Sequence, residues 1–404
     1  MQETLFSSVP GAIDEFRLCQ VLEREAIARH RASWITAADL AQIKRLGLTA
    51  VRVPFGYWLL DPPGPPIVRK PAPPYTGARE WLRTAHEYVG PAEHVISQCL
   101  DACAAAGLLV NLCLHGAPGG QSGEQACGFV DREWTPSMWD VEATVRCVEH
   151  AARLWGRHPA LDALTVINEP SNEIPIETLV GFYEKAYHAA RPHTQCSLVF
   201  PAYKRAWSDF EAAGFPMTYF ENIVIDAHLY QCFGDAWQRE TSLEESLENA
   251  RTGEGHFPCL THLPAPSCVS EWSLRLPVWD DKFPIAQVLA AKDEAAQHAI
   301  YRKLGRAQVM QFASRGASWY FWTWKVDAPS ANRGAIIPGE PMWDLRECVR
   351  RQWLDPRWWG GELLDDGFGA GDVPAGDMHD EADADLADKM VLASETRQYL
   401  PPCK

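Results

Sequence analysis

The chain has 404 residues, of which 47% are hydrophobic and 22% are charged, as in an ordinary globular protein with a sizeable core. The formal net charge of −16 at pH 7 argues against a nucleic-acid partner. No apolar stretch approaches the 18 or so residues that indicate a transmembrane helix, so no membrane span is expected.

The pattern of apolar residues alternates between helix and strand along most of the chain. The segment up to about Arg31 has no strong periodicity. Helices are predicted at residues 36–47, 93–106, 139–157, 176–191, 284–314 and 342–353. Strands are predicted near Val51, Val110, Val166, Leu198, Val224, Val269 and Tyr320. This alternation predicts an α/β fold with a parallel sheet, one strand short of the eight in a (β/α)8 barrel.

Two of the predicted strands end in a glutamate. In the sequence VINEP, apolar residues lead to Asn168 and Glu169, and Pro170 is expected to end the strand. About a hundred residues later, Glu271 ends a second apolar strand and is followed by Trp272. The C-terminal strand ends form the active face of an α/β barrel, so both glutamates are interpreted as catalytic. Together with the many aromatic residues at strand ends, they suggest sugar chemistry.

The twelve cysteines include no CxxC pair. Cys99 and Cys103 have the i, i+4 spacing of a helix but lack the further ligands that a zinc site needs. We therefore expect free thiols rather than a metal site. Cys113 and Cys268 lie within apolar strands and are expected in the core. Whether other cysteines form disulfides does not follow from their spacing.

Six short sequences follow one another at the predicted strand ends: VRVPFGYW, LHGAPGG, VINEP, DAHLYQCFG, CVSEW and WYFWTWK. Together they resemble glycoside hydrolase family 5, and specifically its exo-β-1,3-glucanase branch. The resemblance runs from about Thr4 to Trp353 and implies a (β/α)8 TIM barrel with a retaining mechanism.

The resemblance also implies roles for individual residues. Glu169 would be the acid/base and Glu271 the nucleophile. Further substrate-binding positions match Arg52, His115, Asn168, His228, Tyr230 and Trp324, and Phe233 matches an aromatic residue at the entrance. The implied chemistry needs no cofactor and no metal.

The residue types suit these roles on physical grounds. Asn168 can bind a sugar 2-hydroxyl, a contact that strengthens in the transition state. A guanidinium such as that of Arg52 can hold a nearby carboxylate ionised, and the Tyr230 hydroxyl can donate to Glu271. His115 and His228, taken alone, would more often be structural histidines, so their assignment comes from the resemblance.

Two departures from the family pattern stand out. In the family a first strand, with a Gly-Gly-Trp-Leu motif and a glutamate that contacts the nonreducing sugar, precedes the segment TLFSSVPGAIDEFRLCQ. That first strand is expected to be missing from this chain, which would explain the count of seven. An entrance aromatic expected after LHGAPG is replaced by Glu124, which leaves the acceptor-side contact open.

The predicted organisation is a catalytic barrel over residues 1–361 followed by an acidic tail over residues 362–404. Residues 362–388 contain ten Asp and Glu and no Lys or Arg, so about −6 of the net charge remains for the rest of the chain. The tail lacks the apolar content to fold alone and is expected to be disordered. The resemblance implies an extracellular or cell-surface location, but the start MQETLFSSVP has no signal peptide, which leaves a cytoplasmic location open.

The sequence therefore predicts a monomeric retaining β-glucosidase that hydrolyses β-1,3-glucan or related β-glucosides from the nonreducing end. One alternative is another β-glycosidase of the same family, of the aryl-, rutinoside- or glycolipid-type. The other is a non-catalytic carbohydrate-binding protein or an incomplete gene model, because a barrel without its first strand exposes the edges of its neighbours.

Overall fold

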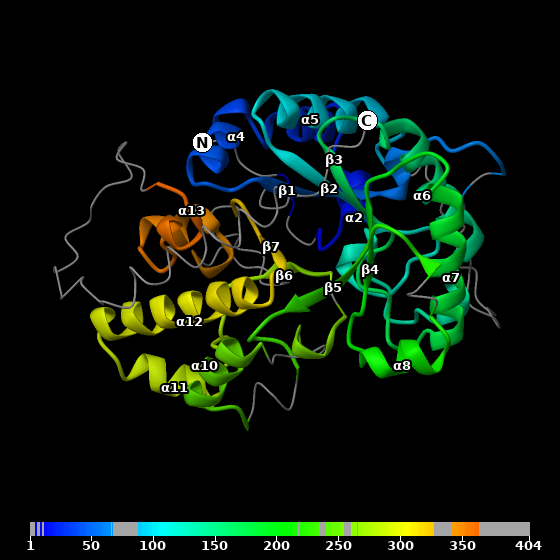
Figure 1. The fold of residues 1–404 in the computed structure, drawn as a ribbon. Helices are drawn as coiled ribbons and strands as arrows, with labels where there is room; N and C mark the ends of the chain where they lie inside the picture. Colours follow the sequence, from blue (N-terminus) through cyan, green and yellow to red (C-terminus); the bar gives the residue numbers. More distant parts are fainter. Residues whose placement is uncertain are drawn as a thin grey trace. The chain divides into compact units, whose positions relative to one another are not determined.

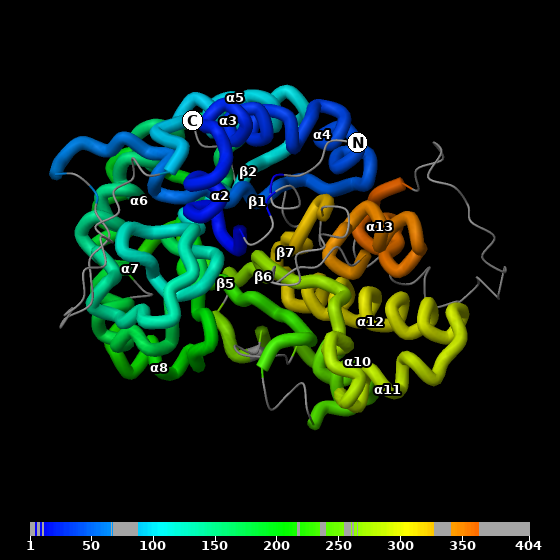
Figure 2. The backbone as a smooth tube through the Cα atoms, turned by 180° about the vertical axis from the view of Figure 1, so that it is seen from behind, coloured from blue at the N-terminus to red at the C-terminus, as the bar shows by residue number. Residues whose placement is uncertain are grey.

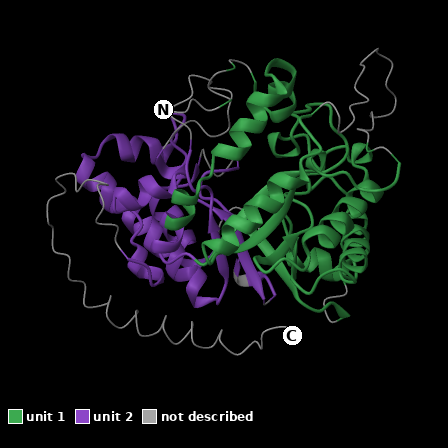
Figure 3. Ribbon diagram, turned by 90° about the horizontal axis from the view of Figure 1, so that it is seen from above, with its two compact units in different colours: residues 1–41, 49–227, 327–339 green, residues 42–48, 228–326, 340–404 purple. Residues whose placement is uncertain are grey.

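The structure is a computed structural model that describes residues 5, 9, 12–65, 67, 88–215, 219–234, 240–253, 260–264, 266–326 and 341–362. The chain divides into two compact units, which Figure 3 colours green and purple. Unit 1 comprises residues 1–41, 49–227 and 327–339, and unit 2 comprises residues 42–48, 228–326 and 340–404.

Seven strands form one sheet in sequence order, from β1 in blue to β7 in yellow (Figure 1). Their bounds are β1 Ala50–Gly56, β2 Leu109–Gly116, β3 Leu161–Thr165, β4 Ser197–Pro201, β5 Ile223–Leu229, β6 Ser267–Trp272 and β7 Ser318–Phe321. The pairings of β1 through β5 and of β6 with β7 are parallel. The predicted α/β class and the predicted count of seven are confirmed, and the described residues contain no eighth strand.

The two ends of the sheet order are β1 and β7. Pro54 lies inside β1, opposite Cys113 of β2. Proline has no backbone N–H to donate and is tolerated where a strand is paired on one side only. The sequence of β1 is therefore that of an edge strand.

Unit 1 contains α2 Glu15–Val21, α3 Arg24–Ser33, α5 Glu93–Ala105, α6 Val141–Trp155, α7 Ile176–Ala190 and α8 Trp207–Ala212, and α4 Ala37–Arg45 crosses from unit 1 into unit 2. The helices α2 and α3, dark blue in Figure 2, lie in the segment for which no element was predicted. Asp14 caps α2 by accepting from Arg17 N at 2.7 Å and also accepts from Val130 N at 2.9 Å. Tertiary contacts, which leave no periodicity in the sequence, thus hold this short helix in place.

The helices α6 and α7 pack against each other in unit 1. Val148 and Trp155 of α6 are buried, and Trp139, just before α6, packs edge-to-face on Phe182 of α7 at 5.0 Å between ring centroids. Full burial of side chains of this size contributes roughly 1.5–3 kcal/mol each. These contacts join α6 and the residue just before it to α7.

Unit 2 contains α10 Leu243–Thr252, α11 Pro284–Ala290, α12 Glu294–Ser314, α13 Leu345–Arg350 and the 3-10 turns η7 Pro341–Trp343 and η8 Pro356–Trp359. The single helix predicted at residues 284–314 is wrong, because Asp293 caps a new helix there by accepting from Ala296 N at 2.8 Å. The helix predicted at residues 342–353 is also shorter, since α13 ends at Arg350.

The ten described cysteines are free thiols, and Cys113 and Cys268 are buried as predicted. The predicted disorder of the tail concerns residues 363–404, which lie outside the described residues. Within the part of the chain that the structure describes, no helix is both long and apolar enough to cross a membrane.

Candidate active site

Glu169 lies in a turn beyond β3 and is not the last residue of that strand. The predicted strand through Asn168 is wrong, because β3 ends at Thr165, four residues earlier. The backbone stays bound to neighbouring strands, since Val166 N donates to Val199 O at 3.2 Å and Asn168 N donates to Leu114 O at 2.9 Å. Glu169 then adopts φ of 40°, a left-handed conformation that costs a non-glycine residue about 1–3 kcal/mol. The surrounding contacts must therefore hold this turn.

Gln121, a residue that the sequence analysis did not single out, fixes that turn from the loop after β2. Its fully buried side chain donates from Nε2 to the carbonyls of His115 and Asn168, each at 2.8 Å, and accepts from Ala117 N at 3.0 Å. Its own backbone carbonyl accepts from Ser171 N at 3.0 Å. Gln121 therefore binds the backbone on both sides of Glu169, at Asn168 and at Ser171. In the sequence, this role of Gln121 is signalled only by the presence of an amide side chain in a glycine-rich loop.

Arg205 holds the segment that follows the turn. From the loop after β4, its guanidinium donates to Ser171 O at 3.0 Å and to the carbonyl of Ile174. Burial lowers the pKa of Arg205, but an arginine keeps its charge at neutral pH. Two side chains from different loops thus hold the backbone around Glu169.

Arg52 of β1 determines how the side chain of Asn168 is oriented. Its Nη2 donates to Asn168 Oδ1 at 2.6 Å and to the Cys113 thiol at 3.1 Å. The amide oxygen must face this donor, so Asn168 Nδ2 points the other way. That Nδ2 atom is buried and has no hydrogen-bond partner among the described residues. The Nδ2 donor of Asn168 is therefore available for a further hydrogen bond.

Two other predictions in unit 1 concern His115 and Glu124. His115 lies in β2 with Nδ1 3.8 Å from the Cys113 sulfur, next to the thiol that Arg52 contacts. Glu124 is exposed, and its carboxylate lies 3.9 Å from the ammonium of Lys204. The position expected to hold an entrance aromatic therefore carries an opposite-charge pair.

In unit 2, two of the predicted residues contact Glu271. Glu271 is the second-last residue of β6 and is 5% exposed. The Tyr230 hydroxyl donates to its Oε2 at 2.8 Å, and His228 Nδ1 lies 3.5 Å from the same oxygen. The other ring nitrogen of His228 lies 3.0 Å from Ser270 Oγ. A donor on a buried carboxylate favours its ionised form.

Aromatic side chains gather next to this carboxylate. Phe233 packs edge-to-face on Tyr230 at 5.1 Å, and both contact Trp343 at 6.1 and 5.5 Å. Trp279, 46% exposed, lies 6.5 Å from Phe233. Phe233 was predicted from the sequence, whereas Trp343 of η7 and Trp279 were missed because neither lies within one of the six quoted sequences.

Trp324 follows β7 on a segment that is bound to its neighbours. The Trp322 N–H donates to Trp272 O at 2.8 Å, and the Thr323 N–H donates to Trp343 O at 2.7 Å. The guanidinium of Arg346 lies 5.9 Å from the Trp324 ring centroid. The indole is therefore held in place as a partly exposed flat surface.

Comparison with known proteins agrees with the family resemblance seen in the sequence. No family model matches the chain. The glucan 1,3-beta-glucosidase of Candida oleophila is 26% identical over 371 residues, which cover 83% of this chain and 78% of the relative. The probable glucan 1,3-beta-glucosidase A of Aspergillus niger is 24% identical over 379 residues, which cover 85% of this chain and 80% of the relative. The chain is thus a distant homologue of glucan 1,3-beta-glucosidases over most of its length, which confirms the resemblance.

Among solved structures, the rutinosidase from Aspergillus niger matches with a TM-score of 0.60. It is 16% identical, and the match covers 88% of this chain and 94% of the rutinosidase. A likeness at this level of identity concerns the fold alone. It confirms the predicted TIM-barrel type of fold.

Because the Gln121 side chain bonds to the backbone around Glu169, removing its amide should lower the stability of the protein strongly. Gln121→Leu keeps the size of the side chain but leaves buried backbone groups of Ala117, His115 and Asn168 without this partner. We expect the free energy of unfolding, measured in urea, to fall by about 2–4 kcal/mol. The matched control is Gln287→Leu on the exposed surface of α11, with an expected change within about 0.5 kcal/mol. Equal stability of the two variants would contradict this account of the turn.

Proposed function

We propose that this distant homologue of the glucan 1,3-beta-glucosidases is a retaining β-glucosidase that cleaves β-1,3-glucan or related β-glucosides from the nonreducing end. The observation that carries the proposal is the buried carboxylate of Glu271 with the Tyr230 hydroxyl donating to it at 2.8 Å. A nucleophilic carboxylate must stay ionised and point in one direction, and this hydrogen bond favours both.

The reaction proceeds by two displacements. Glu271 attacks the anomeric carbon while Glu169, as an acid, protonates the leaving glycosidic oxygen, and a covalent glucosyl-enzyme forms. Glu169 then removes a proton from water, which attacks the anomeric carbon and releases Glu271. This mechanism requires the two carboxyl groups about 5–5.5 Å apart.

The contrast between the surroundings of the two glutamates supports this division of roles. Glu271 is almost fully buried, whereas Glu169 is partly exposed in a turn beyond β3. An acid/base must reach the leaving group and then water, while the nucleophile needs contact with one carbon only. The turn that Gln121 and Arg205 hold would present Glu169 in a constant direction.

Asn168 supplies the next contact in the proposal. Arg52 engages its amide oxygen, so the buried Nδ2 atom is the group that can donate to a sugar 2-hydroxyl. Such a bond strengthens as the oxocarbenium ion develops and contributes to the rate rather than to binding alone. Arg52 would act here through Asn168.

The aromatic residues of unit 2 suit the binding of pyranose rings. Trp324 offers a partly exposed face, and Phe233 with Trp279 forms a second apolar surface beside Tyr230. We assign Trp324 to the sugar that is cleaved and Phe233 to the sugar that follows it. These contacts come from side-chain faces and need no metal or cofactor.

A second candidate is a β-glycosidase for aryl glycosides or rutinosides. The observation that favours it is the exposed Glu124 beside Lys204, where the β-1,3-glucanase pattern has an aromatic residue. A charged pair binds phenolic hydroxyls rather than the apolar face of a glucose. The ratio of kcat/KM for laminaribiose to that for an aryl rutinoside separates the two candidates.

The assignment of Glu271 predicts a covalent intermediate. An activated 2-deoxy-2-fluoro-β-glucoside should inactivate the enzyme and add one fluoroglucosyl group to Glu271, located by peptide mass spectrometry. Glu271→Gln should lose activity on aryl β-glucosides by about 10⁴-fold or more. Labelling of any other residue would contradict the assignment.

The assignment of Glu169 predicts rescue by azide. Because an activated aryl glucoside needs little protonation, Glu169→Ala should still form the glucosyl-enzyme, which then accumulates without a base. Added azide should raise turnover about tenfold or more and yield β-glucosyl azide. As the matched control, Glu173→Ala in the next turn should behave as wild type. A folded Glu169→Ala enzyme that azide does not rescue would exclude this role.

A further inference from the structure

The side chains that follow one another from Glu271 become more exposed along a series of ring contacts. Glu271 and Tyr230 are buried, Phe233 is partly exposed, and Trp279 is 46% exposed. Tyr230 contacts Phe233 at 5.1 Å between ring centroids, and Phe233 contacts Trp279 at 6.5 Å. All four residues belong to unit 2. The three rings therefore form a continuous aromatic path from the buried carboxylate to the surface of this unit.

The loop that carries Trp279 is anchored on both sides of this residue. Before it, Leu274 is fully buried, and its N–H donates to Met342 O at 3.2 Å. After it, the Phe283 N–H donates to Asp280 O at 3.1 Å, which closes a turn just before α11. An exposed tryptophan on an anchored loop loses little conformational freedom when a ligand packs on it.

Three side chains hold the indole ring of Trp279. Phe233 and Phe283 contact it at 6.5 and 6.1 Å between ring centroids. The guanidinium of Arg275 lies over the ring, 5.2 Å from its centroid, in a cation–π contact. Because Arg275 is buried, the exposed area of Trp279 is on the side of the ring away from this arginine.

A fixed and exposed indole face suits a pyranose ring. The C–H groups on one face of a β-linked glucose form an apolar surface, and packing that surface on an aromatic ring removes both from water. Consecutive sugars of a glucan are one ring apart, and Trp279 lies one ring beyond Phe233. The path therefore has a place for one sugar more than Phe233 alone can bind.

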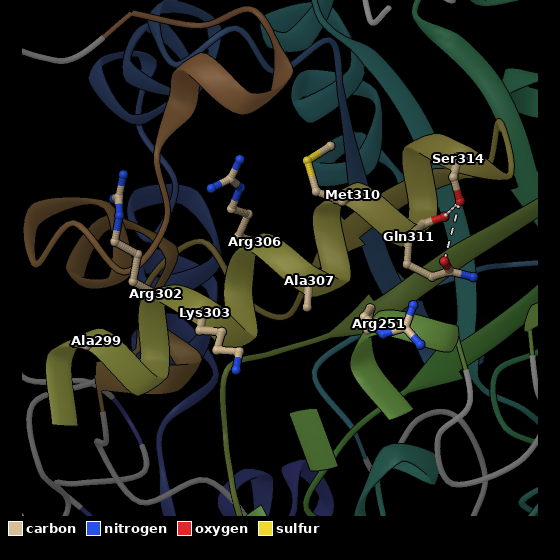
Figure 4. Close-up of a pocket in the computed structure, with 9 residues that line it drawn as sticks. All are labelled: Arg251, Ala299, Arg302, Lys303, Arg306, Ala307, Met310, Gln311 and Ser314. Carbon is tan, nitrogen blue, oxygen red and sulfur yellow. Dashed lines mark hydrogen bonds between the residues drawn. The ribbon is translucent and has the colours of Figure 1, made fainter. Parts of the chain in front are cut away.

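A groove along α12 is a further surface feature of unit 2, and its chemistry is different (Figure 4). It has a volume of about 620 Å³, and its lining includes four cations, Arg251, Arg302, Lys303 and Arg306. None of the nine described residues that line it is aromatic. It therefore offers no flat apolar face to a pyranose ring, and its Met310 is a suitable control position.

We propose that Trp279 forms a subsite for the second glucosyl residue after the cleaved bond. This inference rests on the proposed function, in which Trp324 binds the sugar that is cleaved and Phe233 binds the sugar that follows it. A disaccharide then ends at Phe233, whereas a trisaccharide reaches Trp279. The preferred substrates are therefore β-glucans and oligosaccharides of at least three glucosyl residues.

Binding to the inactive Glu271→Gln enzyme tests the subsite without turnover. Calorimetry should give a Kd for laminaritriose about tenfold lower than that for laminaribiose. Trp279→Ala in the same background should abolish this difference, whereas Trp279→Phe should keep most of it. The matched control, Met310→Ala, should leave both Kd values unchanged. Equal Kd values for the two sugars, or a difference that survives Trp279→Ala, would overturn the subsite.

Hydrolysis by the active enzyme separates this inference from the proposed function. The ratio of kcat/KM for laminaritriose to that for laminaribiose should be about ten, and Trp279→Ala should bring it close to one. Tighter binding of laminaritriose without hydrolysis of any β-glucoside would contradict the proposed function and still support the subsite. A loss of kcat/KM on an aryl β-glucoside as large as that on laminaritriose would mean that Trp279 binds the aryl group, and would overturn the glucan subsite.

Discussion

Parallel pairing of the strands in sequence order is the constraint on which the rest of the structure depends. It places the C-terminal ends of the strands at one edge of the sheet, and the polar residues of the candidate site follow those ends. In unit 1 this brings Arg52 of β1 to Asn168 beyond β3. In unit 2, where β6 follows β5 in the sheet order, Tyr230 just after β5 donates to Glu271 of β6. Chemistry at either glutamate therefore depends on strand register as much as on the glutamate itself.

The sequence predicted the regular elements of this sheet well, because buried strands and amphipathic helices have distinct periods. The strands β4 and β5 contain the predicted Leu198 and Val224, and α7 starts at residue 176 as predicted. The periodicity of apolar residues did not predict elements whose ends are set by single hydrogen bonds. The helix α2 depends on Asp14 and a neighbouring loop. The cap at Asp293 divides the predicted helix at residues 284–314 into α11 and α12. VINEP looked like a strand to its proline, but the backbone turns at Glu169.

The candidate site was predictable only in part, for a similar reason. Glutamates, histidines and a tyrosine at strand ends are visible in a sequence, and Tyr230 and His228 do contact Glu271. Gln121 and Arg205 were missed because they bind backbone carbonyls, and carbonyls are present at every residue. These two residues set the direction of Glu169 without needing to touch a substrate. The proposed chemistry thus depends on loops that carry no recognisable catalytic pattern.

The anomeric form of the first product tests the central claim most directly. ¹H NMR of an aryl β-glucoside mixed with the enzyme resolves the two anomers of glucose before they interconvert. Two displacements at the same carbon, by Glu271 and then by water that Glu169 activates, predict that β-glucose appears first. Initial release of α-glucose would mean a single displacement and would contradict the assignment of Glu271 as nucleophile.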